Sequence, residues 1–580
     1  MNRYKFGIVI SLIVVLSLIL GACSTPATEA PPAVEEPVEE VVEEAPPEET
    51  EEMEEVEEEV VEEPAEEVAE EPTEEPAEEP TEEPAEEPME AMGGELIYAL
   101  PSDIASFDPH ATRETVSGMV NSQIFDYIIM LSPDGTAAPG LAQSWEVSED
   151  ELTWTFKLVE GAKFHDGSDL TAESVKINLD RALNPDNALP ASRLLSGITE
   201  VNAIDDTTLE IVTEKPLGAL LFHLSHYSLG IISPAALESM SPEELGQNPV
   251  GSGAFKFVSY TPNESIVLEK NPDYWGTVAS VDTVTFKPVP EAASRSVLIE
   301  TGEADVVTKL EPLDALALQD VDGMRVDVVP FTRVVFIHMN EFIEPLGDVR
   351  VRQALSYAVD RQSIVDNILQ GLAVVATGPL GKGVSMYTPT ENYDYDPEKA
   401  KELLAEAGYA DGLTLKMWVP QGRYQGAEAA SEAVQAQLAE VGVTVEMEII
   451  EWSTLLENIR KGPEEAEWEL LVLGFAPATN DADWQLYTQF HTDNWAPNSN
   501  NRSFYSNPEV DALLETGKFS TDPEVRQAAY AELLDIVLED APEIYLYQTT
   551  QIYGVRDNVQ GLTYLPIDIQ FLNLVSLEPQ

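Results

Sequence analysis

Residues 413–475 decide the fold, because strand patterns and helix patterns alternate through them. They read LTLKMWV (413–419), AEAASEAVQAQLAE (427–440), VTVEMEII (443–450), a helical stretch at 454–461, and WELLVLGF (468–475). The strand segments are rich in β-branched and aromatic residues, whereas the helical segments carry spaced apolar side chains. This β-α-β-α-β order predicts parallel strands joined by right-handed crossovers, in an α/β fold.

Two loops should meet at one edge of this sheet, because every strand-to-helix loop leaves a parallel sheet from the same side. Ligands gather at that edge. The candidate residues are Arg423 and Tyr424 in the first loop, Phe475 at the end of the last strand, and Asn480, Asp481, Asp483 and Trp484 in the second loop. Arg grips a carboxylate in bidentate fashion and Asp accepts from an ammonium group, so a zwitterion fits. The alternative is that each is a solvated loop residue.

The segments on either side extend the α/β pattern. A helix is predicted from Asp396-Pro397-Glu398 to Gly408, with an apolar stripe along one face. The N-terminal half is predicted to be mixed and strand-rich, with a capped amphipathic helix at 171–183. Its predicted strands lie at 95–100, 152–158, 209–213, 253–260, 265–270 and 282–288.

The N-terminus has the pattern of an export signal. Arg3 and Lys5 precede an apolar run over 8–20, which is shorter than the roughly 20 residues of a membrane-spanning helix. Leu20-Gly21-Ala22-Cys23 resembles a bacterial lipobox, which implies cleavage after residue 22 and a diacylated Cys23. Cys23 is the only cysteine, so an intrachain disulfide is excluded.

Residues 24–92 consist mainly of Glu, Pro, Ala, Thr and Val, and they contain no Lys or Arg. Frequent prolines and mutual repulsion between carboxylates oppose both a helix and a compact core. We predict that this segment is disordered. It is interpreted as a stalk that lifts a folded domain off the membrane, with an inert low-complexity insert as the alternative.

Composition excludes some classes of partner. The chain carries 107 acidic and 30 basic residues, a net charge of −77, and its Lys and Arg are scattered singly. Phosphate binding needs clustered cations, so nucleic acid is not expected as a partner. The 580-residue length favours two or more domains.

Five segments together resemble the family 5 bacterial extracellular solute-binding proteins, which serve ABC importers of dipeptides, oligopeptides, glutathione and nickel. They are FHDGSDLTAESV (164–175), GSGAFK (251–256), NPDYWG (271–276), DVRVRQALSYAVD (348–360) and the helix at 396–408. The resemblance implies a large two-lobed fold of the peptide-binding type, which closes on its ligand. It also implies an ABC permease as partner, a position on the outer face of the cytoplasmic membrane, and a monomer.

This resemblance also sets expected domain boundaries. They are a signal peptide at 1–22, the lipidated cysteine and stalk at 23–92, a strand-rich lobe one at 93–340 and 546–580, and an inserted α/β lobe two at 341–545. The hinge strands are expected near 336–340 and 544–547.

The family's binding residues transfer only in part. Arg423 stands where dipeptide-binding members hold the peptide carboxylate, but their ammonium-binding Asp falls here on Ala478. Asp481 or Asp483 could replace it or could cap a turn. The segments 474–484 and 500–505 are similar to the glutathione-binding branch, which adds Arg502 and Tyr505 as candidates. In lobe one, members offer backbone groups near Ser117.

Catalysis and metal binding find little support in the sequence. His223 and His226 have a spacing that a metal could use, but no third ligand accompanies them, so buried structural histidines are the preferred interpretation. No nucleophile motif, Walker loop or His-Glu-x-x-His is present. We therefore expect no cofactor, no metal and no enzymatic activity. A small peptide similar to glutathione is the expected ligand, with a nickel chelate, another solute or a cell-surface peptidase as alternatives.

Overall fold

The computed structural model describes residues 93–579 of the chain. The signal peptide, Cys23 and the stalk fall outside the described residues, so those predictions stay predictions. Between residues 93 and 579, no helix combines the length and the hydropathy needed to cross a membrane.

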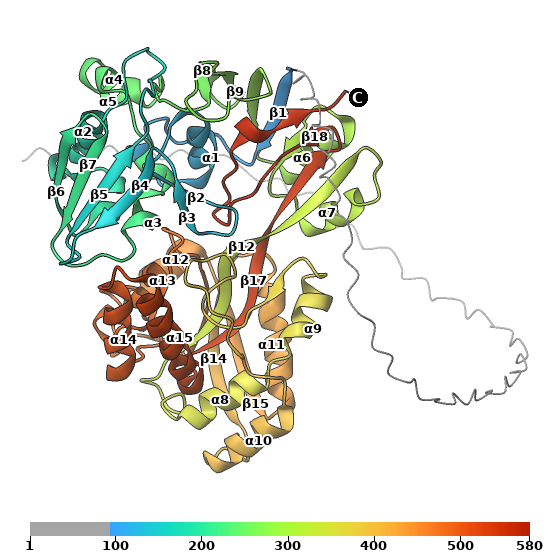
Figure 1. The fold of residues 1–580 in the computed structure, drawn as a ribbon. Helices are drawn as coiled ribbons and strands as arrows, with labels where there is room; N and C mark the ends of the chain where they lie inside the picture. Colours follow the sequence, from blue (N-terminus) through green and yellow to red (C-terminus); the bar gives the residue numbers. More distant parts are fainter. Residues whose placement is uncertain (1–92, 580) are drawn as a thin grey trace, which may run out of the picture. The chain divides into compact units, whose positions relative to one another are not determined.

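One mixed sheet of 11 strands runs through these residues (Figure 1). Its strands, in spatial order, are β15 (Val443–Ile450), β14 (Leu413–Pro420), β16 (Leu470–Phe475), β12 (Met324–Met339), β17 (Glu543–Arg556), β11 (Val306–Val307), β1 (Glu95–Leu100), β10 (Thr283–Pro288), β9 (Ser265–Lys270) and β8 (Phe255–Thr261). The short strand β13 (Val374–Val375) also pairs with β17.

A second, antiparallel sheet has the order β4 (Ala142–Val147), β5 (Thr153–Leu158), β7 (Thr208–Thr213) and β6 (Ile198–Asp205). Two strand pairs complete the β-structure: β2 (Ile129–Leu131) with β3 (Ala137–Pro139), and β18 (Val559–Gln560) with β19 (Ser576–Leu577). The helices of the N-terminal half are α1 (Thr115–Ile124), α2 (Ala172–Leu183), α3 (Leu220–Leu224), α4 (Pro234–Ser239), α5 (Pro242–Leu245), α6 (Ala292–Thr301) and α7 (Pro312–Leu318).

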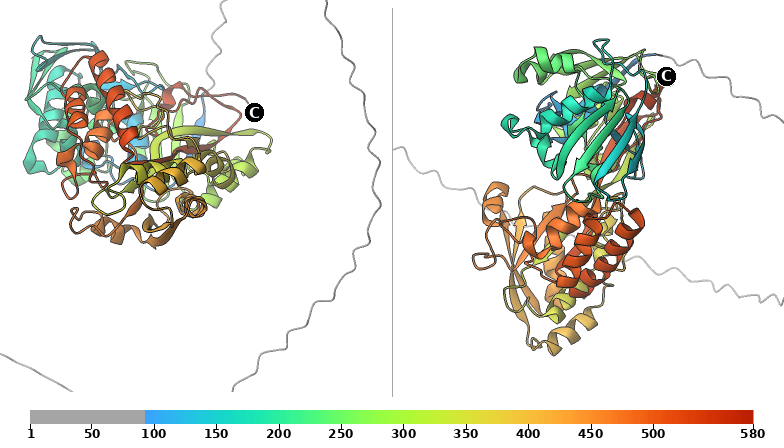
Figure 2. Two further views of the ribbon diagram at one scale, coloured as in Figure 1. Left: turned by 90° about the horizontal axis from the view of Figure 1, so that it is seen from below. Right: turned by 60° about the vertical axis from the view of Figure 1, so that its left-hand side comes forward.

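The remaining helices are α8 (Val349–Tyr357), α9 (Arg361–Ser363), α10 (Pro397–Glu406), α11 (Ala427–Glu440), α12 (Trp452–Asn458), α13 (Ala482–Phe490), α14 (Pro508–Lys518) and α15 (Pro523–Asp540). Figure 2 shows α13, α14 and α15 packed together, whereas α10 and α11 lie apart from them. The apolar faces of α8, α10 and α11 share one buried cluster with β14, β15 and β16.

The parallel-sheet prediction is confirmed. β14 pairs in parallel with both β15 and β16, and α11 and β15 have the predicted bounds. The helix expected at 454–461 instead spans Trp452–Asn458. It starts earlier because the Glu451 carboxylate accepts from the backbone N–H groups of Ser453 and Thr454 and so caps the helix. The last strand begins at Leu470 rather than 468.

The expected hinge strands belong to two long antiparallel strands, β12 and β17. Their pairing shifts register between Pro330 and Val334. From Val334 to Met339, β12 also pairs with β16, so these residues share a sheet with the expected lobe two. The register shift therefore lies at the junction of the two halves of the sheet, a few residues before the expected boundary at 340.

Candidate functional site

A cavity of about 630 Å³ lies where four chain segments meet. Its lining residues come from 309–312 before and at the start of α7, from Arg333 on β12, from 422–429 in the loop and first turn of α11, and from 549–552 on β17. These segments carry three cations, Lys309, Arg333 and Arg423, and two carboxylates, Glu311 and Glu428. A cavity of this size and polarity suits a small charged ligand.

Arg423 and Tyr424 are presented by a tight loop between β14 and α11. Gly426 makes the turn possible with a φ of 70°, and a Cβ there would lie 2.2 Å from the Leu369 side chain. Arg423 lies over the Trp452 ring, 4.8 Å from its centroid, and over the neighbouring Tyr424 ring at 5.6 Å. These cation–π contacts orient the guanidinium without neutralising it, so its charge stays available to a ligand.

Arg333 contributes a second guanidinium to the same cavity. It lies over the Tyr424 ring at 5.8 Å, and its Nε is buried without a hydrogen-bond partner. Burial lowers the pKa of the Arg333 side chain, and the nearby Arg423 lowers it further. Within residues 93–579, neither Arg333 nor Arg423 forms an ion pair with a carboxylate.

Gly474 leaves room for this arrangement at the end of β16. A Cβ on Gly474 would lie 3.0 Å from Tyr424 Cε1 and 3.1 Å from Arg333 Cδ. Phe475 follows it, half-buried and paired with Val334 of β12. The ends of β14 and β16 therefore share one edge, as the sequence predicts, and the two arginines gather there.

The second loop, however, has a different environment from the first. Asp481 is fully buried and caps α13, and its carboxylate binds Arg526 of α15 in bidentate fashion, with N–O distances of 2.6 and 3.1 Å. Of the two roles that the sequence left open, capping is the one observed. None of the residues that line the cavity beside Arg423 comes from this loop, and the ligand-binding roles predicted for the loop stay predictions.

The neighbours of Asp481 in this loop are likewise engaged with the protein. Asp483 is buried, its Oδ2 lies 3.8 Å from Lys518 Nζ, and burial raises the pKa of its carboxyl. The Asn480 amide donates to the carbonyls of Gly135 and Gly383. The Trp484 ring packs edge-on against His223, with Arg113 over it at 5.7 Å.

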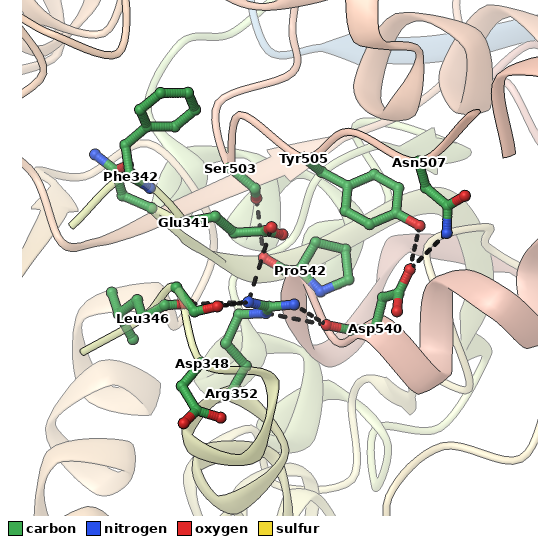
Figure 3. A network of polar contacts seen from close by, with 12 residues as sticks. Glu341, Phe342, Leu346, Asp348, Arg352, Ser503, Tyr505, Asn507, Asp540 and Pro542 are labelled. Atoms are coloured by element: carbon green, nitrogen blue, oxygen red, sulfur yellow. Dashed lines mark hydrogen bonds and ion pairs between the residues drawn. The ribbon is translucent and has the colours of Figure 1, made fainter. Parts of the chain in front are cut away.

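Three further candidates lie outside the lining of the cavity. Tyr505 donates to the Asp540 carboxylate at 2.6 Å, in a polar network that also holds Arg352 and Glu341 (Figure 3). The Arg502 side chain donates to Asn500, and burial lowers its pKa to about 10. The Ser117 hydroxyl is buried, and it accepts from the backbone of Ala105. Their roles as ligand-binding residues stay predictions.

Sequence reasoning missed Arg333 and Lys309. Arg333 is the only charged residue in a mainly apolar stretch of β12, VVPFTRVVFI (328–337), and this was the available signal. Nothing in the local pattern marks Lys309, because only the approach of 309–312 to the α11 loop places it at the cavity.

The two histidines whose spacing could suit a metal, His223 and His226, lie inside the protein. His223 and His226 are buried, and burial lowers the pKa of His223 to about 4 and the pKa of His226 to about 3. His226 Nδ1 accepts from the backbone of Ser228. Across 93–579, no group of three or more His, Cys, Asp or Glu side chains has an arrangement that could hold a metal ion.

Solved structures share this architecture. HbpA2 from Haemophilus parasuis is 26% identical with a TM-score of 0.77, over 84% of this chain and 100% of that one. The periplasmic binding protein DppA from Helicobacter pylori, solved with the peptide STSA, is 27% identical with a TM-score of 0.66, over 84% and 98%. The α/β, two-lobed fold of the periplasmic binding proteins, expected from the sequence, is confirmed, and it defines the chain as a solute-binding protein.

The family follows from the sequence comparisons. Residues 136–497 match the model of the bacterial extracellular solute-binding proteins, family 5. A glutathione-binding protein, GsiB of Pectobacterium atrosepticum, is 33% identical over 474 residues, which are 81% of this chain and 92% of that protein. The chain therefore belongs to the family 5 bacterial extracellular solute-binding proteins.

Proposed function

We propose that this protein captures a small anionic peptide, of the size and charge of glutathione, outside the cytoplasm and delivers it to an ABC permease. The observation that carries the proposal is the pair of guanidiniums, Arg333 and Arg423, which line one cavity without a carboxylate partner among the described residues. Because the chain has a net charge of −77, two neighbouring cations without an ion-pair partner are unusual, and they favour the binding of an anion.

A carboxylate ligand would stabilise the charged form of the Arg333 side chain. Burial and mutual repulsion disfavour the charged form of Arg333, and a bound carboxylate opposes both effects. The N-terminus of α11 adds to the attraction, since Gly426 offers no side-chain cap and helix N-termini favour anions, while the Glu428 carboxylate of this turn accepts from the backbone N–H of Gly422. A peptide such as glutathione carries two carboxylates, which two arginines can bind.

Closure of the two lobes on the ligand would prepare the protein for docking on the permease. A ligand that contacts both halves of the sheet stabilises the conformation in which those contacts exist, and this conformation is the one that docks on the permease. We further propose that Cys23 is the lipid anchor and that residues 24–92 are the spacer on which the folded part reaches its permease. The domain boundaries given above belong to the same proposal.

The test is calorimetric titration of residues 93–580 with reduced glutathione and with a dipeptide mixture. Arg423→Ala removes one charged hydrogen-bonding partner, worth about 1.5–3 kcal/mol, and should weaken binding by about 10- to 150-fold. Arg350→Ala, an exposed arginine of α8 that pairs with Asp348, is the matched control and should bind like the wild type.

Equal affinity of Arg423→Ala and the wild type contradicts the assignment of this cavity. Mass spectrometry of the ligand released after denaturation decides the class of protein. Intact peptide supports a binding protein, whereas cleaved products support a peptidase.

A further inference from the structure

A buried carboxylate lies next to a cation of the cavity, and the proposed carboxylate contacts of the ligand do not use it. Asp568 follows β18 in the C-terminal segment, and only 2% of its surface is exposed. Its Oδ2 lies 3.8 Å from Nζ of Lys309, a residue that lines the cavity. That distance is too long for a hydrogen bond, and between residues 93 and 579 no hydrogen bond reaches this oxygen.

A chain of hydrogen bonds leads to Asp568 from the protein interior. The Tyr98 hydroxyl donates to Gln570 Oε1 at 2.7 Å, Gln570 Nε2 donates to the Tyr553 hydroxyl at 2.9 Å, and Tyr553 donates to Asp568 Oδ1. Each donor in such a chain polarises the next, and all of them point toward the carboxylate. One oxygen of Asp568 thus accepts a hydrogen bond, while the other has Lys309 as its ion-pair partner at 3.8 Å.

Both partners have an unusual backbone conformation. Asp568 has a φ of 63° and Lys309 a φ of 52°, the left-handed region that residues other than glycine rarely adopt. The turn before Asp568 is closed by a hydrogen bond from its backbone N–H to the Leu565 carbonyl. Conformations of this kind cluster where a side chain must be presented to a ligand.

We propose that Asp568 binds the ammonium group of the peptide, with Lys309 occupying this position only when no ligand is bound. The proposal rests on the peptide-binding function proposed above. It supplies the anchor that the sequence lacks at Ala478, and it places the anchor beside Lys309 and within the electrostatic influence of Arg333 rather than on α13. Asp481 is already paired with Arg526, whereas Asp568 is the only carboxylate among residues 93–579 that forms an ion pair with one of the cavity's three cations.

The electrostatics of Asp568 agree with this role. Burial raises the pKa of its carboxyl, while Lys309, the Tyr553 hydroxyl and Arg333 lower it. An ammonium group arriving within hydrogen-bond distance would stabilise the ionised form far better than Lys309 does at 3.8 Å.

The experiment compares reduced glutathione with its N-acetylated form, which lacks the ammonium group. The wild type should bind the free-amine peptide at least about tenfold more tightly. Asp568→Asn should lose this preference by weakening the binding of glutathione alone, with the N-acetylated affinity unchanged. Asp483→Asn, which removes the buried carboxylate of α13, is the control and should keep the preference.

Three results would overturn the proposal. They are a wild type that binds both peptides equally, a preference that disappears in Asp483→Asn instead, and an Asp568→Asn variant that weakens both peptides to the same extent. The first of these uses unmodified protein and does not depend on whether a variant folds. A wild type that binds neither peptide refutes the proposed function as a whole, whereas binding without preference refutes only the role of Asp568.

Discussion

Replacing Asp481 by Asn tests whether this residue supports the fold or binds the ligand. Its carboxylate and the Arg526 guanidinium are 0% and 2% exposed, and they are joined by two hydrogen bonds. Arg526 also donates to the carbonyls of Gly517 and Gly218. Asn keeps the shape of the side chain but leaves the Arg526 charge buried without a counter-ion.

The expected loss follows from that unpaired charge. Breaking a buried ion pair on one side costs about 3–5 kcal/mol. For a domain of the size expected for lobe two, each kcal/mol lowers the midpoint of thermal unfolding by roughly 2–4 °C, so the midpoint should fall by about 6–20 °C. Calorimetry of the ligand-free protein gives this midpoint directly.

Asp535→Asn is the matched control, since Asp535 is exposed on α15 and the change is chemically the same. Its effect should stay within about 0.5 kcal/mol. The reasoning is refuted if Asp481→Asn unfolds at the temperature of the wild type. If that variant also loses glutathione binding, Asp481 is a ligand-binding residue, as one reading of the sequence held.

Two further changes probe the network of Figure 3 and the cavity wall. Burial raises the pKa of the Glu341 carboxyl from its ordinary 4.5 to about 7, although Arg352, 3.8 Å away, lowers it. The stability that Glu341 contributes is therefore present below pH 4.5 and is lost as the pH rises to about 7. Glu341→Gln should therefore be about 3 kcal/mol more stable than the wild type at pH 8 but not at pH 4 in urea unfolding, and a difference that does not change with pH contradicts this. Gly474→Ala places a Cβ 3.0 Å from Tyr424 and should weaken glutathione binding several-fold. The control is Gly462→Ala, where the nearest atom is 3.7 Å from the added Cβ, and it should bind like the wild type. Equal affinities of the two variants would show that Tyr424 and Arg333 need not keep their positions.

Periodicity predicted the fold well where local pattern and packing agree. β1, β9, β15 and α11 have the bounds that the sequence predicted, since alternating or spaced apolar residues bury one face of each element. The early start of α12 was missed, because the Glu451 cap competes with the apolar pattern that indicated Thr454.

The candidate site was predicted less completely. Arg423 and Tyr424 were found because they follow a strand of a parallel sheet, and the structure places both at the cavity. Asp481 follows another strand of the same sheet, but its partner Arg526 lies on α15, far along the chain. No local sequence pattern predicts that ion pair.

The sequence by itself determined the α/β class, the alternation of residues 413–475 and the family, because these depend on local periodicity and on segments that keep their order. Tertiary structure decided which charges are free. Whether a carboxylate or guanidinium is available to a ligand depends on neighbours brought close by folding: Arg526 neutralises Asp481, whereas Lys309 reaches Asp568 only at 3.8 Å. Electrostatic energy depends on distance through space and on burial, and neither can be read from position along the chain.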